Sequence, residues 1–181
     1  MNQGNPQDTS SRELLWDLIK DIKFAMLTTE HADGHLHAHP VTTQNRNIDR
    51  GDILWFFISR AGHPAADIAR QSRVSLAYAH PGRDSYVSVS GIAAIVENRS
   101  KKEELFSRMT QAWFPGGMDD PDLALLRVRI NRAHFWDVRE HKLVQLYKLA
   151  KAAFTGTRPD DLGETGEVRM GAGRRQAGAA G

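Results

Sequence analysis

The chain has 181 residues, and its 40% of hydrophobic and 25% of charged residues are ordinary proportions for one folded domain with a short tail. Its 24 lysines and arginines are nearly balanced by 22 aspartates and glutamates, so we expect no nucleic-acid partner. Cysteine is absent, which excludes disulfides and cysteine nucleophiles, and the longest purely apolar run, at positions 53–58, is too short to span a membrane.

The first predicted elements are a flexible N-terminus, residues 1–9, and a helix that follows it. Ser10 and Glu13 have capping-box spacing, in which each side chain satisfies a backbone N–H of the first helical turn, so the helix is predicted to begin at Ser10. Apolar residues then recur at helical spacing and predict one buried stripe, formed by Leu14, Leu15, Leu18, Ile19 and Ile22.

Six further segments have the composition and length of strands. Asp33-Gly34 predicts a hairpin turn between the first two, because glycine tolerates a positive φ. Gly91, inside the fifth, predicts a bulge or a close approach of another group. The predicted strands are residues 24–29, 36–44, 53–58, 74–79, 86–97 and 126–136.

Two helices are predicted between these strands. The first covers 64–70, where a proline suits the opening turn. The second covers 100–113 and begins with a capping box formed by Ser100 and Glu103.

The predicted fold class is mainly β (α+β). The links between strands are mostly of hairpin length, which favours an antiparallel sheet, and six short strands favour a closed barrel without exposed edges. Residues 143–154 are predicted as strand or helix, since periodicity does not decide between them. Residues 10–155 are expected to form one domain, and residues 156–181, which hold seven of the fifteen glycines, a disordered tail.

Three histidines alternate along the second predicted strand, so His35, His37 and His39 are predicted to share one face. Neighbours on one face lie about 6.6 Å apart, close enough for two imidazoles to meet at one metal ion. No carboxylate or cysteine has a helpful spacing, however, and no metal site is predicted. A solvated histidine face and a contact between His39 and an anion or ligand both stay open.

The link from the third strand to the next helix is a candidate phosphate site. Backbone N–H groups at the start of a helix carry partial positive charge and can hold a phosphate. Within the segment Ser59-Arg60-Ala61-Gly62-His63-Pro64, the side chains of Arg60 and His63 add donors. The alternative is an ordinary helix start that binds only water.

Two other clusters are expected to be structural. Asp119, Asp120 and Asp122 are predicted to cap a turn or helix in preference to binding a cation. The sequence also lacks a Gly-x-Ser-x-Gly hydrolase motif and a dinucleotide-binding glycine motif. The sequence also contains a set of aromatic residues, namely Trp55, Phe56, Phe57, Trp113, Phe114, Phe135 and Trp136. Such flat rings could stack on a flat heterocyclic ligand. For most of them, however, a place in the barrel core or at a subunit interface is the better explanation.

Four segments, at 55–59, 86–91, 113–121 and 133–137, resemble one known family in their order and spacing. They are similar to the general stress protein branch of the pyridoxamine 5'-phosphate oxidase-like, FMN-binding split barrels, and the resemblance covers residues 14–155. It implies a six-stranded antiparallel split β-barrel with flanking helices. It also implies a homodimer that holds two flavins at the subunit interface.

The resemblance also implies where the flavin binds. In such proteins the segment equivalent to 39–44 runs beside the flavin, and the strand end at 57–58 and the turn after it approach the ribityl phosphate. Tyr86 and Trp136 occupy positions that reach the cofactor bound mainly by the partner chain. The implied cofactor-binding residues are His39, Pro40, Val41, Thr42, Thr43, Gln44, Phe57, Ile58, Ser59, Arg60, Gly62, His63, Tyr86, Trp113 and Trp136.

This chain departs from the family pattern at three phosphate contacts. The family usually has an arginine at the position of His39, and a serine and a lysine at the positions of Gly62 and Pro64. A charge-assisted contact is worth about 1.5–3 kcal/mol, so the loss of two cations is expected to weaken flavin binding by a few orders of magnitude. Arg60 and His63 are expected to compensate in part, together with the imidazole of His39.

The resemblance implies a cytoplasmic, FMN-binding general stress protein, with FAD as the second choice of cofactor and no membrane partner. We expect a flavin-dependent oxidoreductase that exchanges hydride or electrons with an unknown small molecule. Residues 137–141 do not reproduce the Arg/His motif that grips a second phosphate, so efficient pyridoxamine phosphate oxidation is not expected. A non-catalytic flavin carrier, buffer or sensor and, less favoured, a haem- or metal-binding barrel stay open. No catalytic residue is assigned.

Overall fold

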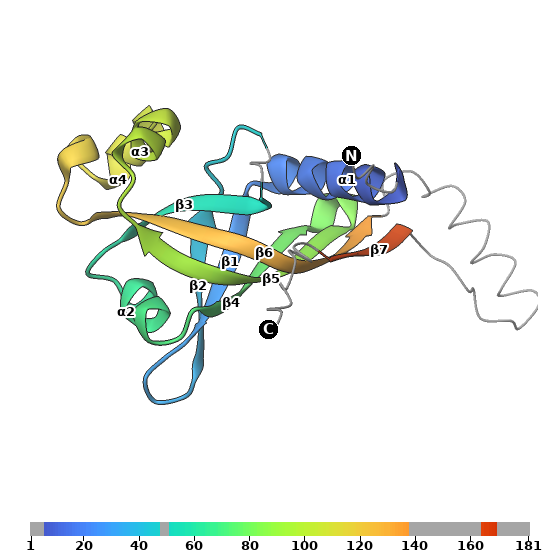
Figure 1. Cartoon of the computed structure of the whole chain (residues 1–181), viewed down its shortest axis with the longest axis horizontal. Coiled ribbons are helices and arrows are strands. Elements are labelled where there is room, and N and C mark those ends of the chain that lie inside the picture. The colour runs from blue at the N-terminus through green and yellow to red at the C-terminus, as the bar shows by residue number, and fades with distance from the viewer. Residues whose placement is uncertain (1–5, 48–50, 138–163, 170–181) are drawn as a thin grey trace, which may run out of the picture.

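A computed structural model describes residues 6–47, 51–137 and 164–169 (Figure 1). The elements in chain order are α1 (Pro6–Ile22), β1 (Phe24–Glu30), β2 (Leu36–Thr42), β3 (Ile53–Ser59), α2 (His63–Arg70), β4 (Arg73–His80), η1 (Pro81–Arg83), β5 (Ser85–Val96), α3 (Arg99–Leu105), α4 (Arg108–Trp113), η2 (Gly117–Asp119), β6 (Leu123–Asp137) and β7 (Glu164–Arg169). The six predicted strands and the helix near 64–70 are therefore confirmed.

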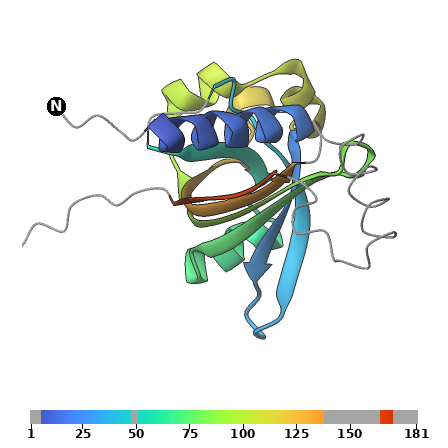
Figure 2. The ribbon, with the colours of Figure 1, turned by 90° about the vertical axis from the view of Figure 1, so that its right-hand side faces the viewer.

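The strands form one antiparallel sheet in the order β2-β1-β4-β5-β6-β3, with β7 paired to the later part of β6. The sheet curls until its two end strands meet (Figure 2). There the Gln44 backbone N–H donates to the Trp55 carbonyl at 2.8 Å, and the Asn45 side chain bonds the Ile53 carbonyl at 2.9 Å and the Trp55 N–H at 2.7 Å. The predicted split barrel with flanking helices is confirmed.

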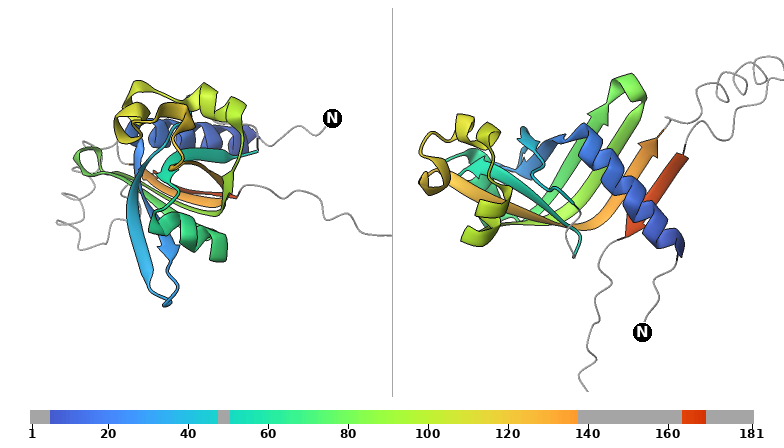
Figure 3. Two further views of the ribbon diagram at one scale, coloured as in Figure 1. Left: turned by 90° about the vertical axis from the view of Figure 1, so that its left-hand side faces the viewer. Right: turned by 90° about the horizontal axis from the view of Figure 1, so that it is seen from above.

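The main core lies between α1 and the inner face of the curled sheet. The predicted stripe of α1 is buried, with Leu15, Leu18 and Ile19 at most 1% exposed. Figure 3 shows α1 lying across the strands, where the stripe joins one cluster with Leu27 and Leu76. Burial of each such leucine contributes about 1.5–3 kcal/mol, so packing holds this helix in place.

A second, smaller apolar cluster lies on the opposite face of the sheet. Trp55, Leu105 and Leu125 form it, with Phe57 packed against them. The Lys101 ammonium group lies 5.6 Å from the centre of the Trp55 ring, within cation–π range. This cluster and the burial of Phe56 and Phe135 in the main core confirm the structural interpretation for much of the aromatic set.

The bulge predicted at Gly91 is present, and its extra residue lies on the neighbouring strand. Ser90 pairs with Arg132 and Gly91 pairs with Ile130, so Asn131 of β6 has no partner in the register. A Cβ atom on Gly91 would lie 2.7 Å from the Arg129 carbonyl oxygen, which is too close for any side chain. Glycine is therefore required by a close backbone approach.

Both predicted helix starts were wrong. Helix α1 begins at Pro6, so position 10 lies inside it. The predicted helix 100–113 is two helices, because Asn98 caps α3 by accepting the Lys101 N–H at 2.9 Å, and Ser107 caps α4. Asn98 and Ser107 thus cap α3 and α4 in place of Ser100, which the capping-box spacing selected.

The predicted disordered tail contains a strand. Residues 164–169 form β7, which pairs with β6 from Arg132 to Asp137, and this departs from the prediction for that stretch. Residues 143–154, predicted as strand or helix, lie outside the described residues, as does the rest of the tail, so the domain limits stay a prediction. None of the described helices has the length and hydropathy needed to cross a membrane.

Candidate functional site

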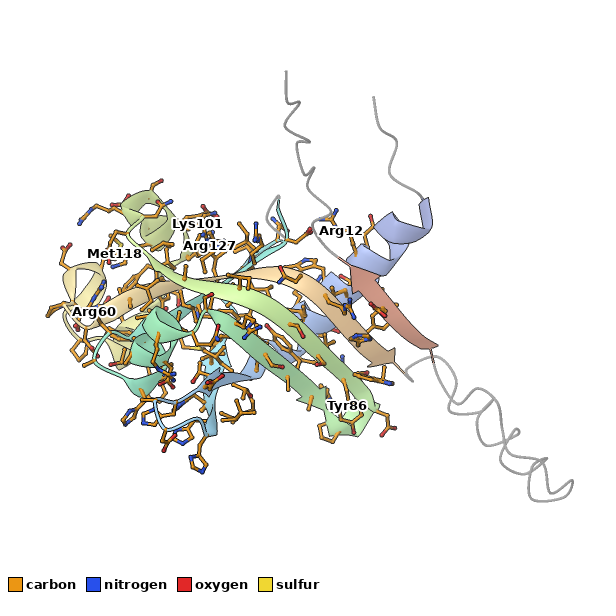
Figure 4. The ribbon with its side chains drawn as sticks, turned by 60° about the horizontal axis from the view of Figure 1, so that its bottom comes forward. Arg12, Arg60, Tyr86, Lys101, Met118 and Arg127 are labelled. Carbon is orange, nitrogen blue, oxygen red and sulfur yellow. The ribbon has the colours of Figure 1, made fainter. Side chains whose placement is uncertain are left out.

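The residues predicted to bind the cofactor fall at separate places on the sheet. One group lies along β2 and at the junction between β3 and α2. The other group is Tyr86 and Trp136, which pair across β5 and β6. Figure 4 shows Arg60 of this junction at one end of the molecule, near Met118, and Tyr86 at the other end. Trp113 belongs to neither group, since it lies on α4 and is 80% exposed. A single copy of the chain therefore does not bring all the predicted residues together.

Alternate residues of β2 face the core and leave little of their side chains for a ligand. Val41 is 7% and Thr43 is 3% exposed, and the Thr43 hydroxyl lies 2.8 Å from the Tyr78 hydroxyl. Burial raises the pKa of Tyr78, and the hydrogen bond to Thr43 acts in the opposite direction. Pro40 and Thr42 lie on the other face of the strand, opposite Met26 and Phe24 in the register.

The last residues of the β2 segment and the end of β3 are also used in the fold. The Gln44 side-chain amide donates to the Thr42 carbonyl at 3.0 Å, while the Gln44 backbone N–H closes the barrel. Ile58 is 6% exposed in the main core. The Phe57 ring meets Phe106 edge-on, with ring centres 6.2 Å apart. These side chains support the shape of the site more than they line it.

The junction after β3 is held by one carboxylate, Asp122. Its Oδ1 atom accepts the Ser59 hydroxyl at 2.9 Å and the Ala61 N–H at 2.8 Å, and its carbonyl accepts the Arg60 N–H at 2.7 Å. The Ala61 N–H, followed by the Ser59 hydroxyl, lowers the pKa of Asp122. The Ser59 hydroxyl and the Arg60 and Ala61 N–H groups of the predicted phosphate site are therefore already occupied, whereas the His63 imidazole is not occupied by any described residue.

The Arg60 guanidinium is also engaged. It lies 2.6 Å from Glu97 Oε1, and this hydrogen bond lowers the pKa of Glu97. The pair borders an open cavity of about 380 Å³ beside the 116–121 loop. There Asp120 accepts the Gly116 N–H at 3.0 Å, which confirms the predicted turn cap. Charged side chains that line this cavity pair with one another, as Arg60 does with Glu97 and Arg99 with Asp119.

Four imidazoles, which we call the histidine array, connect β1, β2 and the start of α2. His31 and His37 are stacked with ring centres 4.9 Å apart and planes at 10°. His63 meets His31 edge-on at 5.4 Å, and His39 meets His37 at 6.4 Å. The array thus joins the two segments predicted to lie beside the flavin. His35, which was predicted on the same face, instead lies 3.2 Å from Asp33 in the exposed turn.

A buried carboxylate lies under the histidine array. Asp67, on α2, is 2% exposed, and it accepts the Thr29 hydroxyl at 2.7 Å and the His31 Nδ1–H at 3.0 Å. Burial raises the pKa of Asp67, but the two hydrogen bonds outweigh burial and lower it overall. Because an ionised carboxylate only accepts hydrogen bonds, His31 must carry its proton on Nδ1.

The stack of His31 and His37 is suited to rings that are not both charged. Two positive charges at 4.9 Å repel by about 3 kcal/mol at an effective dielectric constant near 20. The single negative charge of Asp67 balances one of them. An anion placed against the array would offset the rest.

His39 adds an unsatisfied polar atom to the histidine array. Its Nε2 atom is buried and has no hydrogen-bond partner among the described residues. A buried polar atom without a partner costs about 1–3 kcal/mol. The other such atom is His80 Nδ1, at the end of β4. Within the described ranges, no three side chains are grouped so as to hold a metal ion, so the donors of the array fit an anion such as a phosphate.

The outer face of the sheet exposes a row of large apolar side chains away from the array. Tyr86 pairs with Trp136 in the register, and they are 39% and 44% exposed. Phe24 and Met26 of β1 are 60% and 42% exposed on the same face. His134 stacks on Trp136 with ring centres 6.4 Å apart. Apolar exposure of this kind is typical of an interaction surface.

Sequence reasoning missed the carboxylates that organise the site. Asp67 meets His31 across 36 positions of the chain, and Asp122 meets Ser59 across 63. Hairpin register offered one usable signal, since Thr29 pairs with His37 and so places His31 near the predicted histidine face. The sequence carries no comparable signal for Asp122.

The curled antiparallel sheet, with helices on its flanks, defines a split-barrel protein. The chain belongs to the pyridoxamine 5'-phosphate oxidase-like family, whose model matches residues 10–160. The family predicted from the four sequence segments is therefore confirmed.

Three relatives illustrate the similarity. A general stress FMN/FAD-binding protein from Xanthomonas citri is 32% identical, with a TM-score of 0.62 over 71% of this chain and 89% of that one. A candidate general stress protein 26 from Jannaschia sp. CCS1 is 24% identical, with a TM-score of 0.68 over 90% of this chain and 99% of that one. Protein bli-3 from Neurospora crassa is 23% identical over 143 residues, which are 74% of this chain and 68% of the relative.

Proposed function

We propose that this chain binds FMN, with FAD as the second choice, as a general stress protein of its family. The flavin phosphate would lie against the histidine array, and the ring beside the edge strand β2. The observation that carries this proposal is the buried, unpartnered Nε2 atom of His39, at a position where the family usually has an arginine. The Xanthomonas citri relative, a general stress FMN/FAD-binding protein, supports the choice of cofactor.

The residues of this chain have separate tasks in the proposed complex. His39 and His63 donate to the phosphate, while Asp67 fixes the proton of His31 and thereby its orientation. The junction at 59–61 is held in shape by Asp122 and contributes little to the phosphate itself. When bound, a flavin supplies hydride or electron exchange with a small molecule, and the protein supplies position and electrostatics.

The same proposal includes a homodimer that pairs the exposed outer faces of two copies. Tyr86 and Trp136 lie at the opposite end of the sheet from Arg60, so they reach the flavin only of a second copy. Their partial exposure, and that of Phe24 and Met26, supports this arrangement because burial of apolar surface drives association.

The binding test compares FMN with riboflavin, which lacks the phosphate. Quenching of flavin fluorescence should show FMN binding more tightly than riboflavin, and gel filtration of the same sample should give a dimer. His39→Gln should weaken FMN binding about tenfold, the value of one charge-assisted contact, and leave riboflavin binding unchanged. His35→Gln is the matched control, since this imidazole pairs with Asp33 outside the histidine array. Failure to bind any flavin contradicts the proposal.

Turnover is tested on the FMN-loaded protein by stopped-flow mixing with NADH or NADPH. Fast bleaching of the bound flavin supports an oxidoreductase, and no bleaching supports a carrier, buffer or sensor. Pyridoxamine phosphate should be turned over poorly, because residues 137–141 lack the motif that grips its phosphate.

A further inference from the structure

We propose that the histidine array makes anion binding at this site pH-dependent, so that a phosphate-bearing ligand is held in mildly acidic conditions and released in alkaline ones. This regulation rests on the proposed function, since it concerns the same site. In this chain, imidazoles whose charge depends on pH would take the place of the permanently charged arginine and lysine side chains of the family pattern.

The first step is that the permanent cations around the array are engaged elsewhere. Arg60 is paired with Glu97 at 2.6 Å. The Arg70 guanidinium donates to the Glu30 carbonyl. Among the described side chains, by contrast, the ring nitrogens of the array have one hydrogen-bond partner, the carboxylate of Asp67 at His31. Imidazoles are therefore the donors that this part of the chain offers to an anion.

The second step is that an anion and protons must bind together. His31 and His37 are stacked at 4.9 Å, so protonating both without a new negative charge is unfavourable. A dianion beside the rings offsets this repulsion, and by linkage the protonated rings bind it more tightly. The charged groups that act on the array are Asp67 and Arg70 from α2 and Asp33 from the turn.

The third step is the direction of the effect. An imidazole gains its charge as the pH falls through the range from about 8 to 5. Affinity for an anion of constant charge should therefore rise as the pH falls. A phosphate monoester loses negative charge below about pH 6, which acts in the opposite direction. FMN affinity should accordingly pass through a maximum as the pH falls, whereas affinity for sulfate, which keeps its charge, should rise steadily.

The experiment titrates the full chain with sodium sulfate by calorimetry at pH 5.5 and pH 8.0. Sulfate should bind about tenfold or more tightly at pH 5.5, as expected for one gained charge-assisted contact. His37→Gln and His63→Gln should each reduce this ratio, and the control His35→Gln should keep it. If a variant does not fold, the imidazole proton signals of the unmodified chain, followed by NMR with and without sulfate, give the same information.

Parallel titrations with FMN and riboflavin separate the two proposals. Sulfate affinity that is equal at both pH values, with FMN still bound, overturns the pH dependence and leaves the proposed function standing. Sulfate affinity that rises at pH 5.5, with no flavin bound at any pH, supports the anion site and overturns flavin binding. Riboflavin affinity should not change between the two pH values, and a change equal to that of FMN contradicts the role of the phosphate.

Discussion

Two neighbouring regions of this protein both contain polar groups suited to an anion, and they use them differently. At the junction after β3, the Ser59 hydroxyl and the Ala61 N–H both donate to Asp122. In the histidine array, His39 buries a ring nitrogen with no partner among the described residues. Donors at the start of a helix are therefore not a binding site in themselves. The region with donors left unsatisfied is the one that calls for a ligand.

The largest effect is expected at the carboxylate below the array. Asp67→Ala leaves the Thr29 hydroxyl and His31 Nδ1–H without an acceptor in a buried place, so the free energy of unfolding should fall by about 2–4 kcal/mol. Urea denaturation of the variant and the unmodified chain at pH 7 measures this difference. A loss below about 0.5 kcal/mol would show that the array does not depend on Asp67.

The same residue gives a pH dependence with a defined sign. The pKa of Asp67 is lowered in the folded chain, so its ionised form adds stability above its ordinary value of 3.8. This contribution should vanish as the pH falls through the lowered folded value. The stability difference between the unmodified chain and Asp67→Asn should therefore shrink in acid, and a constant difference would contradict the assignment.

A smaller effect is expected at the junction. Asp122→Ala removes the acceptor of the Ser59 hydroxyl and the Ala61 N–H, so the thermal unfolding midpoint should fall, though less than in Asp67→Ala. FMN affinity should not decrease, because the freed donors face the site without a competing carboxylate. A marked loss of FMN binding at unchanged stability would reverse the comparison between the two regions.

The smallest effect on stability is expected at the exposed pair of Arg60 and Glu97. Glu97→Gln should change the free energy of unfolding by less than about 0.5 kcal/mol, as is usual for surface pairs. It should also release Arg60 and so strengthen FMN binding slightly. Binding weaker than that of the unmodified chain would show that Glu97 orients Arg60 toward the ligand.

Local patterns in the sequence predicted the strands well and the polar edge of the sheet poorly. The run at 53–58 and the hairpin at Asp33-Gly34 have composition that specifies them locally, and Gly34 has the expected positive φ of 86°. Strand β7 escaped prediction because its sequence, ETGEVR, has little apolar alternation. It becomes a strand by pairing with β6, a contact that local patterns do not encode.

The sequence predicted which segments form the site, but it did not predict which of their polar groups have hydrogen-bond partners in the fold. The sequence placed His39 and His63 in candidate ligand segments, and the structure links them through His37 and His31. Val41 and Thr43, which were predicted to bind the cofactor, are instead buried in the core. The hydrogen bond from the Ser59 hydroxyl to Asp122 joins residues 63 positions apart, so it could be recognised only from the three-dimensional structure.

The unpaired Asn131 sets which way the end of β6 faces. Before it, Val128 and Ile130 point into the barrel, and after it Ala133 and Phe135 do. If Asn131 instead took a place in the ladder, the alternation downstream would invert, sending Trp136 inward and Phe135 into water. The aromatic end of the strand therefore owes its outward aim to one bulged residue, so a variant that kept Asn131 but lost the bulge would lose this exposed apolar surface without losing any of its side chains.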